Sequence, residues 1–373
     1  MPIDLSHDET CAWLTLLRAP GLGPAGLREL LGRHAGAVAV IAAARSESSI
    51  PEAARVWLAA PDDAAIARDL AWLEGTDHHL IVWSSADYPA LLRNVPNAPA
   101  ALFVAGNPTH LWSPQIAIVG ARSATAGGLA NARNFAKAFV HAGNTITSGL
   151  AEGIDGAAHA AALDAGGTTI AVLGTGPDLI YPRQHAELAA RIQANGALVS
   201  EFPPGTPGKP EHFPRRNRII AGLSLGTLVI EASLKSGSLI TARLAAEQGR
   251  EVFALPGSIH SPLARGCHRL IRDGAKLVET ADEVLDELHG VGALLADGLR
   301  QRLEFPEGSA QIQSGHAHDP DYVRLLEATA AAPAAMDELV ARTGLSAAAL
   351  SSMLLVLELE GVVVAENGRY QQR

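Results

Sequence analysis

The sequence predicts an α/β protein built on a mostly parallel sheet, with a helical segment before the sheet and a small helical and hairpin tail after it. Short apolar runs recur through the middle of the chain, and several of them end in glycine or serine. Segments whose apolar residues have helical spacing alternate with these runs. Strands that alternate with helices in this way form parallel sheets through right-handed crossovers, with helices on both faces.

The composition indicates a large globular chain and excludes several classes of protein. The 373 residues are 48% hydrophobic and carry a formal net charge of −10, so a nucleic-acid partner would need a local basic patch. Cys11 and Cys267 are the only cysteines, which excludes a disulfide framework and a cysteine-ligated zinc site. The first residues lack the apolar core of a signal peptide, and no run of about 18 apolar residues could span a bilayer. We therefore expect a cytoplasmic protein without a membrane partner.

Residues 1–75 are expected to form a helical domain. Residues 10–19 and 27–31 have apolar side chains at helical spacing, and the turn between them, residues 21–24, reads Gly-Leu-Gly-Pro. Such a turn either presents N–H groups to a nucleic-acid phosphate, as in helix-hairpin-helix modules, or simply joins two helices of a bundle. Few basic residues lie nearby, which favours the simple turn.

Residues 76–289 hold the alternating pattern of the sheet. A proline-rich connector, residues 88–99, separates the first expected strand from the second. Strands are expected at residues 80–83, 101–104, 116–119, 145–147, 170–173, 197–200, 227–230, 252–255 and 276–278, and a last helix at 282–288. The strands that begin at residues 116, 145 and 170 each end where a helix is about to start. We expect these turns to leave bare backbone N–H groups at helix N-termini, where anions bind.

Residues 290–318 are expected to be a linker, and residues 319–373 a winged-helix domain. Helical patterns at 325–326, 336–340 and 346–360 precede a hairpin whose turn is Asn367-Gly368. A winged helix usually places its third helix in a DNA groove. Residues 343–368, however, contain no lysine or arginine and do contain three glutamates. This charge favours a protein contact for the tail over a DNA contact.

The first turn of the sheet does not fit a dinucleotide or ATP. It reads Gly120-Ala121-Arg122, with an arginine where the G-x-G-x-x-G fingerprint has its second glycine, and the next strand ends without a carboxylate for a ribose. No P-loop motif is present. Asp155 and His159 lie four residues apart on one expected helix, but no third metal ligand accompanies them, which favours structural hydrogen bonds. We therefore expect no cofactor, no metal and no catalytic group.

The turns fit a phosphate site with cations at its rim. Arg122 follows a core strand, and its planar guanidinium suits phosphate because it donates two hydrogen bonds in parallel. The most basic stretch, residues 209–218, includes Phe213 as a surface on which a base of a single strand could stack. The candidate DNA- and phosphate-binding residues are Gly120, Arg122, Ser148, Gly149, Gly174, Arg183, Lys209, Phe213, Arg215, Arg216, Asn217, Arg218, Ser236, Gly237 and Ser238.

Several of these motifs resemble those of the DNA-processing protein family DprA, also called Smf. Together they cover roughly residues 80–288, and the two end segments are more loosely similar to that family's sterile-alpha-motif-like and winged-helix domains. The motifs are V-G-x-R at 119–122, S-G-x-A-x-G-I-D-x-x-A-H at 148–159, I-Y-P at 180–182, F-P-x-R-N-R-I-I-A-G-L at 213–223, S-G-S-L-I-T-A at 236–242 and L-I-x-x-G-A at 270–275.

The resemblance implies a Rossmann-like domain that binds single-stranded DNA, protects it, and loads the recombinase RecA during natural transformation. It also implies a homodimer formed through that domain, and it places Arg122, Arg183 and residues 216–218 in the DNA-binding pocket. Two positions depart from the family pattern. Arg183 replaces a frequent lysine, which keeps the charge, and Gly127 replaces a frequent tyrosine, so no ring is expected there.

Two functions of different classes follow. The preferred one is a binding and loading protein without catalysis, whose affinity depends little on base sequence and falls steeply with salt. The alternative is a nucleotide hydrolase of a related Rossmann-like fold. Such enzymes carry a P-G-G-x-G-T turn with a carboxylate nearby, whereas residues 233–238 here read S-L-K-S-G-S, with Glu231 close in sequence.

Overall fold

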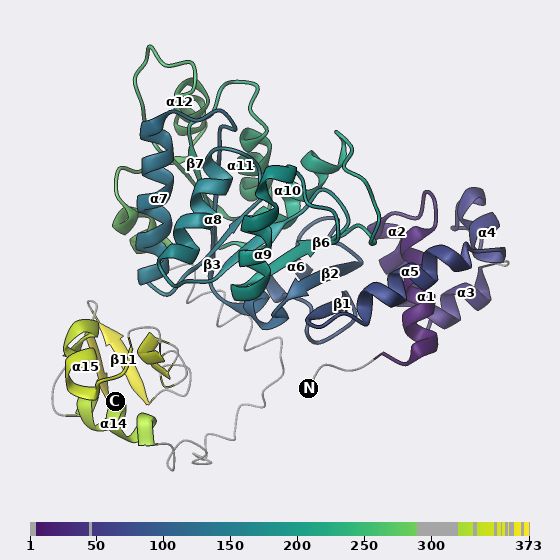
Figure 1. Ribbon diagram of the computed structural model, residues 1–373, viewed down its shortest axis with the longest axis horizontal. Coiled ribbons are helices and arrows are strands. Elements are labelled where there is room, and N and C mark those ends of the chain that lie inside the picture. Colours follow the sequence, from purple (N-terminus) through teal and green to yellow (C-terminus); the bar gives the residue numbers. More distant parts are fainter. Residues whose placement is uncertain are drawn as a thin grey trace. The chain divides into compact units, whose positions relative to one another are not determined.

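The computed structural model (Figure 1) describes residues 5–44, 47–288, 320–330, 334–346, 349–351, 353–354, 357, 362–366 and 369–372. The chain divides into two compact units, Met1–Ala293 and Leu294–Arg373. The first unit contains the N-terminal helices together with the large sheet. The predicted domain boundary between residues 75 and 76 therefore falls inside one compact unit and stays a prediction.

Five helices precede the sheet: α1 (His7–Arg18), α2 (Pro24–Arg33), α3 (Ala37–Ala43), α4 (Glu52–Ala59) and α5 (Asp63–Leu73). Side-chain caps begin two of them, because Ser6 accepts a hydrogen bond from Glu9 N and Asp62 accepts one from Ala65 N. Their apolar faces pack around Trp13 and against the first strands of the sheet, at the β1 end of the molecule in Figure 1. The first unit thus has one continuous interior from α1 to the sheet.

The sheet has nine strands, and its order confirms the predicted mostly parallel fold. The strands are β1 (His78–Val82), β2 (Ala101–Gly106), β3 (Gln115–Gly120), β4 (Thr145–Ser148), β5 (Thr169–Val172), β6 (Ala197–Ser200), β7 (Gly226–Ile230), β8 (Glu251–Ala254) and β9 (Lys276–Leu277). Their order is β1-β2-β6-β5-β4-β3-β7-β8-β9, parallel from β6 to β9, with β2 antiparallel to both of its neighbours. The chain leaves β3 toward β4 on one side and returns to β7 on the other. This reversal of strand order is where α/β sheets bind ligands.

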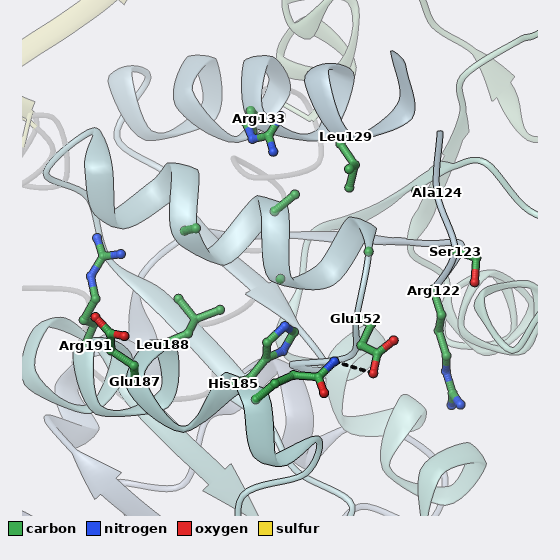
Figure 2. A pocket seen from close by; sticks show the side chains of 15 residues that line it. Arg122, Ser123, Ala124, Leu129, Arg133, Glu152, His185, Glu187, Leu188 and Arg191 are labelled. Atoms are coloured by element: carbon green, nitrogen blue, oxygen red, sulfur yellow. Dashed lines mark hydrogen bonds between the residues drawn. The ribbon is translucent and has the colours of Figure 1, made fainter. Parts of the chain in front are cut away.

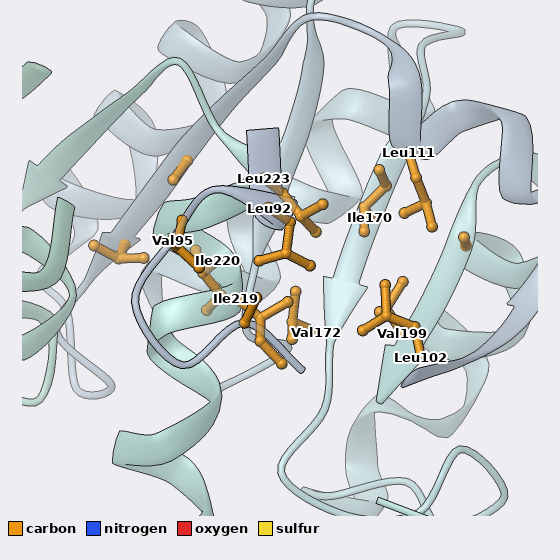
Figure 3. Close-up of a cluster of buried hydrophobic side chains, with 14 of the residues drawn as sticks. Leu92, Val95, Leu102, Leu111, Ile170, Val172, Val199, Ile219, Ile220 and Leu223 are labelled. Carbon is orange, nitrogen blue, oxygen red and sulfur yellow. The ribbon is translucent and has the colours of Figure 1, made fainter. Parts of the chain in front are cut away.

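Alternating side chains divide the interior into two layers, because successive residues of a strand point to opposite faces. Ile116 and Ile118 of β3 face α7 (Ala126–His141), α8 (Ile154–Asp164) and the helix at 281–288. Residues of the other parity face α6 (Ala90–Arg93), α10 (His212–Leu223), α11 (Ser238–Glu247) and α12 (Arg265–Arg272). Figure 3 shows this second layer, in which leucines and isoleucines of α6 and α10 meet valines of β5 and β6. Helix α9 (Ala186–Asn195) covers β5 and β6 on the α7 side.

Gly153 allows the turns after β3 and β4 to pack closely against each other. It has φ +75°, and a Cβ at this position would lie 2.3 Å from Ala121 O and 2.4 Å from Arg122 O. Ile154 N donates to Ala121 O at 3.2 Å. Only glycine fits both the dihedral angle and the space, so this residue fixes the turn that carries Arg122 against the start of α8.

The second unit contains α14 (Pro320–Ala330), β10 (Ala334–Ala335), α15 (Met336–Thr343), β11 (Val363–Glu366) and β12 (Arg369–Gln372). The strands form an antiparallel sheet in the order β10-β12-β11, and the described residues 349–351, 353–354 and 357 between them are helical. Helices followed by a hairpin are the order of a winged helix, as predicted. The predicted linker, the hairpin turn and two of the three tail glutamates lie outside the described residues.

Candidate nucleic-acid interface

The turns after β3, β4 and β5 and the first turns of α10 meet at the carboxyl edge of the sheet. The Arg216 side chain of α10 lies over the turn after β4, where Nη2 donates to Gly149 O at 2.8 Å. A Cβ on residue 149 would lie 1.5 Å from Arg216 Nη1. Gly149 therefore leaves the space that the guanidinium fills, and two predicted site residues from distant motifs come into direct contact.

Arg216 is a buried cation with free hydrogen-bonding capacity. The residue is only 5% exposed, and its Nε and Nη1 atoms have no partner among the described residues. Burial lowers the pKa of Arg216 to about 10; Asp155 opposes this shift, and Arg122, which lies nearby, adds to it. The side chain is thus charged at neutral pH. Buried donors without partners cost free energy until an acceptor arrives, so the arrangement suits an anion.

Several of the backbone N–H groups expected to be bare at this edge are occupied. Thr125 caps α7, because its hydroxyl accepts from Gly128 N at 3.0 Å. The Glu231 carboxylate, at the end of β7, accepts in turn from Thr125 N at 2.8 Å and Thr125 Oγ1 at 2.5 Å. Asp155 accepts from Gly149 N at 3.1 Å and Ala151 N at 3.4 Å. The expectation of bare N–H groups after β3 and β4 was wrong for Thr125, Gly149 and Ala151, because carboxylates of the chain itself accept their hydrogen bonds.

Two further candidate residues, Gly120 and Ser148, lie at the ends of β3 and β4. Gly120 ends β3, and a Cβ there would lie 1.9 Å from Ile230 O of β7. The buried Ser148 hydroxyl donates to Ile118 O at 2.6 Å. Burial raises the pKa of Asp155, and Arg216 opposes that shift. These residues hold the turns in position, and their direct contact with a ligand stays a prediction.

The turn after β5 brings aromatic rings to the same edge. The Phe213 ring lies against Gly174, since a Cβ there would be 2.8 Å from Phe213 Cδ1. His212 Nδ1 pairs with Gly174 O at 3.2 Å. The ring of Tyr181, which sequence reasoning quoted only within a motif, lies beside Phe213. The sequence could have indicated Tyr181 as a site residue, because it follows the loop at the end of a predicted strand.

Exposed cations occur in the turns at this edge of the sheet. Arg183 begins the short helix η2 (Arg183–His185), and Lys209 lies in the loop between β6 and α10. Both side chains are exposed, as is Arg122. None of the three makes an ion pair or a hydrogen bond with another side chain of the described residues. Their charges are therefore available to a ligand at the surface.

Arg215 and Arg218, by contrast, are paired inside the protein. Arg218 binds both carboxylate oxygens of Glu201, at 2.6 and 2.8 Å, and donates to Asn97 O. The half-exposed Arg215 binds the same carboxylate at 2.7 Å and lies 5.3 Å from the Phe202 ring centroid. These contacts fix α10 to the end of β6. As DNA contacts, both arginines stay a prediction.

The remaining candidates lie where α10 meets the start of α11. Asn217 Nδ2 donates to Gly237 O at 3.4 Å, and the Ser236 and Ser238 hydroxyls pair at 2.7 Å. This turn follows β7, on the other side of the strand-order reversal from the turn of Arg122. Its role as a second anion site stays a prediction.

A cavity of about 680 Å³ opens beside Arg122, among α7, α8 and α9. Arg133 and Arg191 line it together with Glu152 and Glu187, so its charge is mixed. Figure 2 shows the Arg122 side chain at one end of the cavity, extending away from α7 and Arg133. Arg122 thus borders this cavity while its charge acts on Arg216.

Two alternatives raised by the sequence find structural explanations. The arginines around the Gly-Leu-Gly-Pro turn all have protein partners: Arg18 binds Asp69, Arg28 binds Ala98 O and Arg33 binds Glu47. The turn therefore adds no free cation. His159 Nδ1 pairs with Thr169 Oγ1 at 2.6 Å, and burial lowers the pKa of His159 to about 3.

No described helix is long and apolar enough to cross a bilayer.

The fold and the edge define a class: a Rossmann-like protein with several arginines at the carboxyl edge of its sheet and a winged helix. Sequence comparison then identifies the family. The profile described as DNA recombination-mediator protein A matches residues 79–289, and that of the DprA winged helix domain matches residues 309–369. This chain belongs to the DprA (Smf) family.

Curated relatives and solved structures agree with this assignment. Protein Smf of Escherichia coli K12 is 45% identical over 307 residues, which are 82% of this chain and 80% of that protein. DprA of Streptococcus pneumoniae R6 is 48% identical over 202 residues, 54% of this chain and 71% of that protein. The X-ray structure of S. pneumoniae DprA matches with a TM-score of 0.67 at 37% identity, covering 74% of this chain and 97% of that chain. A DNA processing protein A structure from Helicobacter pylori, described for its single-stranded DNA binding mode, matches with a TM-score of 0.51 at 28% identity, covering 54% and 93%.

Proposed function

We propose that this protein binds single-stranded DNA at the carboxyl edge of β3–β6, protects the incoming strand, and loads the recombinase RecA onto it in natural transformation. The observation that carries the proposal is Arg216, a buried guanidinium near the exposed Arg122, two of whose nitrogens have no partner in the part of the chain that the structure describes. A phosphate oxygen supplies the acceptor that these nitrogens lack. The single-stranded DNA binding described for the H. pylori relative supports the choice of ligand.

Phosphate contacts supply most of the affinity in this proposal. Arg122, Arg183, Lys209 and Arg216 form a local basic edge on a chain whose net charge is −10. Phosphates are the same at every nucleotide, so binding depends little on base sequence. For single strands, the logarithm of the binding constant falls with the logarithm of salt concentration by about 0.7 per phosphate neutralised.

The protein acts in the cytoplasm as a homodimer built through the Rossmann-like domain, and it contacts RecA directly. Family membership supports these three points. Light scattering of the full chain tests the dimer, and a pull-down of RecA by the DNA-free protein tests the contact. A monomer at all concentrations contradicts the first point, and an absence of capture contradicts the second.

The protein works by binding, without catalysis, cofactor or metal. A hydrolase would need a carboxylate free to act on a nucleotide, and Glu231, the carboxylate nearest the relevant turn, is bound to Thr125 N and Oγ1. Residues 233–238 also lack the glycine-rich turn of such enzymes. Incubation with nucleoside monophosphates, followed by chromatography for free base, tests this. Released base contradicts the proposal.

The decisive test is Arg122→Ala against Lys137→Ala. Both changes remove one exposed positive charge, but Lys137 lies about 16 Å along α7 from its first residue, toward the amino edge of the sheet. Loss of one charged hydrogen bond, about 1.5–3 kcal/mol, raises Kd by about ten- to 150-fold. Anisotropy titrations with oligonucleotides of several sequences should show this loss for Arg122→Ala alone. If the two variants bind DNA with equal affinity, the carboxyl edge of the sheet is not the DNA-binding site.

A further inference from the structure

Tyr181 presents an unusually exposed ring at the proposed DNA-binding edge. The residue is 54% exposed although it follows directly on the loop of a core strand. Its ring centroid lies 5.3 Å from that of Phe213, and the two planes are inclined at 46°. Phe213 covers one side of the tyrosine ring, which leaves the rest of the ring facing solvent.

Hydrogen bonds hold the loop that carries this ring, and Phe213 contacts the ring itself. Phe213 is fixed by its contact with Gly174. The loop after β5 is bonded to the loop after β6: Gly176 N donates to Thr206 O at 2.8 Å, and Gly205 N donates to Asp178 Oδ1 at 2.8 Å. Within the first loop, Thr175 Oγ1 donates to Leu179 O at 2.5 Å. A ring fixed before binding loses little conformational entropy when a ligand arrives.

Two exposed cations belong to the loops around this ring. Arg183 follows Tyr181 by two residues, and Lys209 belongs to the neighbouring loop that is bonded to it. Both are exposed and make no ion pair within the described part of the chain. An exposed aromatic ring among free cations is the arrangement by which proteins bind unpaired strands, since the ring stacks on a base and the cations hold the backbone.

We propose that Tyr181 stacks on one base of the bound strand, and that Phe213 supports the tyrosine ring from behind. This inference rests on the proposed single-stranded DNA binding and adds a base contact to it. Phe213 is half-buried and already in contact with Gly174 and Tyr181. Because the two planes are inclined, one flat base cannot lie on both rings. Stacking accepts every base, since all bases have a π face, and so it agrees with binding that ignores sequence.

The test compares Tyr181→Ala, Tyr181→Phe and Trp112→Ala with the wild type. Trp112 is a matched control because it is 42% exposed but ends η1 (Pro108–Trp112), just before the amino end of β3. The ligands are an oligothymidine and a strand of the same length without bases. Tyr181→Ala should weaken oligothymidine binding by about five- to 150-fold, the factor expected for one base–aromatic stack. Tyr181→Phe and Trp112→Ala should bind as the wild type does.

Two further readouts separate stacking from other causes. The salt dependence of Tyr181→Ala should equal that of the wild type, because no phosphate contact is lost. On the strand without bases, Tyr181→Ala and wild type should bind equally. A loss of the same size on both strands, or a reduced salt slope, would overturn stacking. Tyr181→Trp gives an independent check, because its fluorescence should be quenched when oligothymidine binds, and an unchanged signal contradicts the proposal.

The outcome also separates this inference from the function on which it rests. If Tyr181→Ala binds oligothymidine like the wild type while Arg122→Ala is weakened, the stacking role is wrong and the phosphate site stands. If neither variant is weakened, the proposed DNA-binding edge itself is wrong.

Discussion

Two buried arginines on α10 should respond oppositely to the same substitution. Arg216 is 5% exposed and Arg218 is 8% exposed, and they lie two residues apart. Arg218 is fully paired, because it binds both oxygens of Glu201, whereas two nitrogens of Arg216 have no described partner. We predict that Arg218→Met strongly destabilises the protein, while Arg216→Met leaves it stable and weakens DNA binding.

The magnitudes follow from the contacts. Burial lowers the pKa of Arg216 from 12.5 to about 10, and at about 1.4 kcal/mol per pKa unit the charged form costs the fold about 3 kcal/mol. This cost is fully present at pH 7, because pH 7 lies below both the folded and the unfolded pKa of Arg216. Methionine removes this net cost, which already includes the attraction to Asp155, but it also removes the bond to Gly149 O, worth about 1.5–3 kcal/mol. The two contributions have opposite signs and similar size, so the free energy of unfolding should change far less than in Arg218→Met. Arg218→Met leaves Glu201 buried and poorly paired, which costs about 3–5 kcal/mol.

The assay combines urea unfolding of the DNA-free variants with anisotropy titration at several salt concentrations. Arg216→Met should unfold near the wild-type midpoint, bind weakly, and show a salt slope smaller by about 0.7. Arg218→Met should unfold at much lower urea. If Arg216→Met destabilises the protein as much as Arg218→Met does, Arg216 is a structural cation, and the argument that it awaits a phosphate is refuted.

Two other predictions concern the same region. Gly149→Ala should keep the fold but displace the Arg216 guanidinium, since the new Cβ would lie 1.5 Å from Nη1. We expect weakened oligonucleotide binding with an unchanged far-ultraviolet circular dichroism spectrum. Binding with wild-type affinity would contradict this prediction. The pKa of His159 is lowered to about 3 by burial, so its contribution to stability is present above its unfolded pKa of about 6.5 and is lost as pH falls toward 3. His159→Gln should flatten the decline of the urea midpoint below pH 6.5, and an equally steep decline would show that other groups cause it.

Local pattern predicted the sheet well. Strands at the predicted positions alternate with helices, and the residue parity in β3 assigns Ile116 and Ile118 to one layer of the interior and Ala117 and Val119 to the other. The period of two in a strand and the spacing of a helix are properties of neighbouring residues, so the sequence carries them directly. The antiparallel insertion of β2 between β1 and β6 was not predicted, because strand order depends on contacts between distant segments.

The site was predicted less completely, and the reason is again sequence distance. Glu231 occupies the N-terminus of α7 from 106 residues away, so the turn after β3 looked open when judged by its own residues. Arg216 and Arg218 belong to one motif and looked equivalent. Their different partners, Gly149 and Glu201, come from two different strand ends.

The sequence by itself therefore determined the α/β fold and the family, because each of these depends on short contiguous motifs, and it predicted which edge of the sheet carries the proposed site. Only the tertiary structure decided which backbone N–H groups already have acceptors, which buried arginine keeps two nitrogens without a partner among the described residues, and which ring faces solvent. Those properties depend on what lies within a few ångströms in space. The folding of distant segments onto one edge sets these neighbours, and no local pattern encodes them.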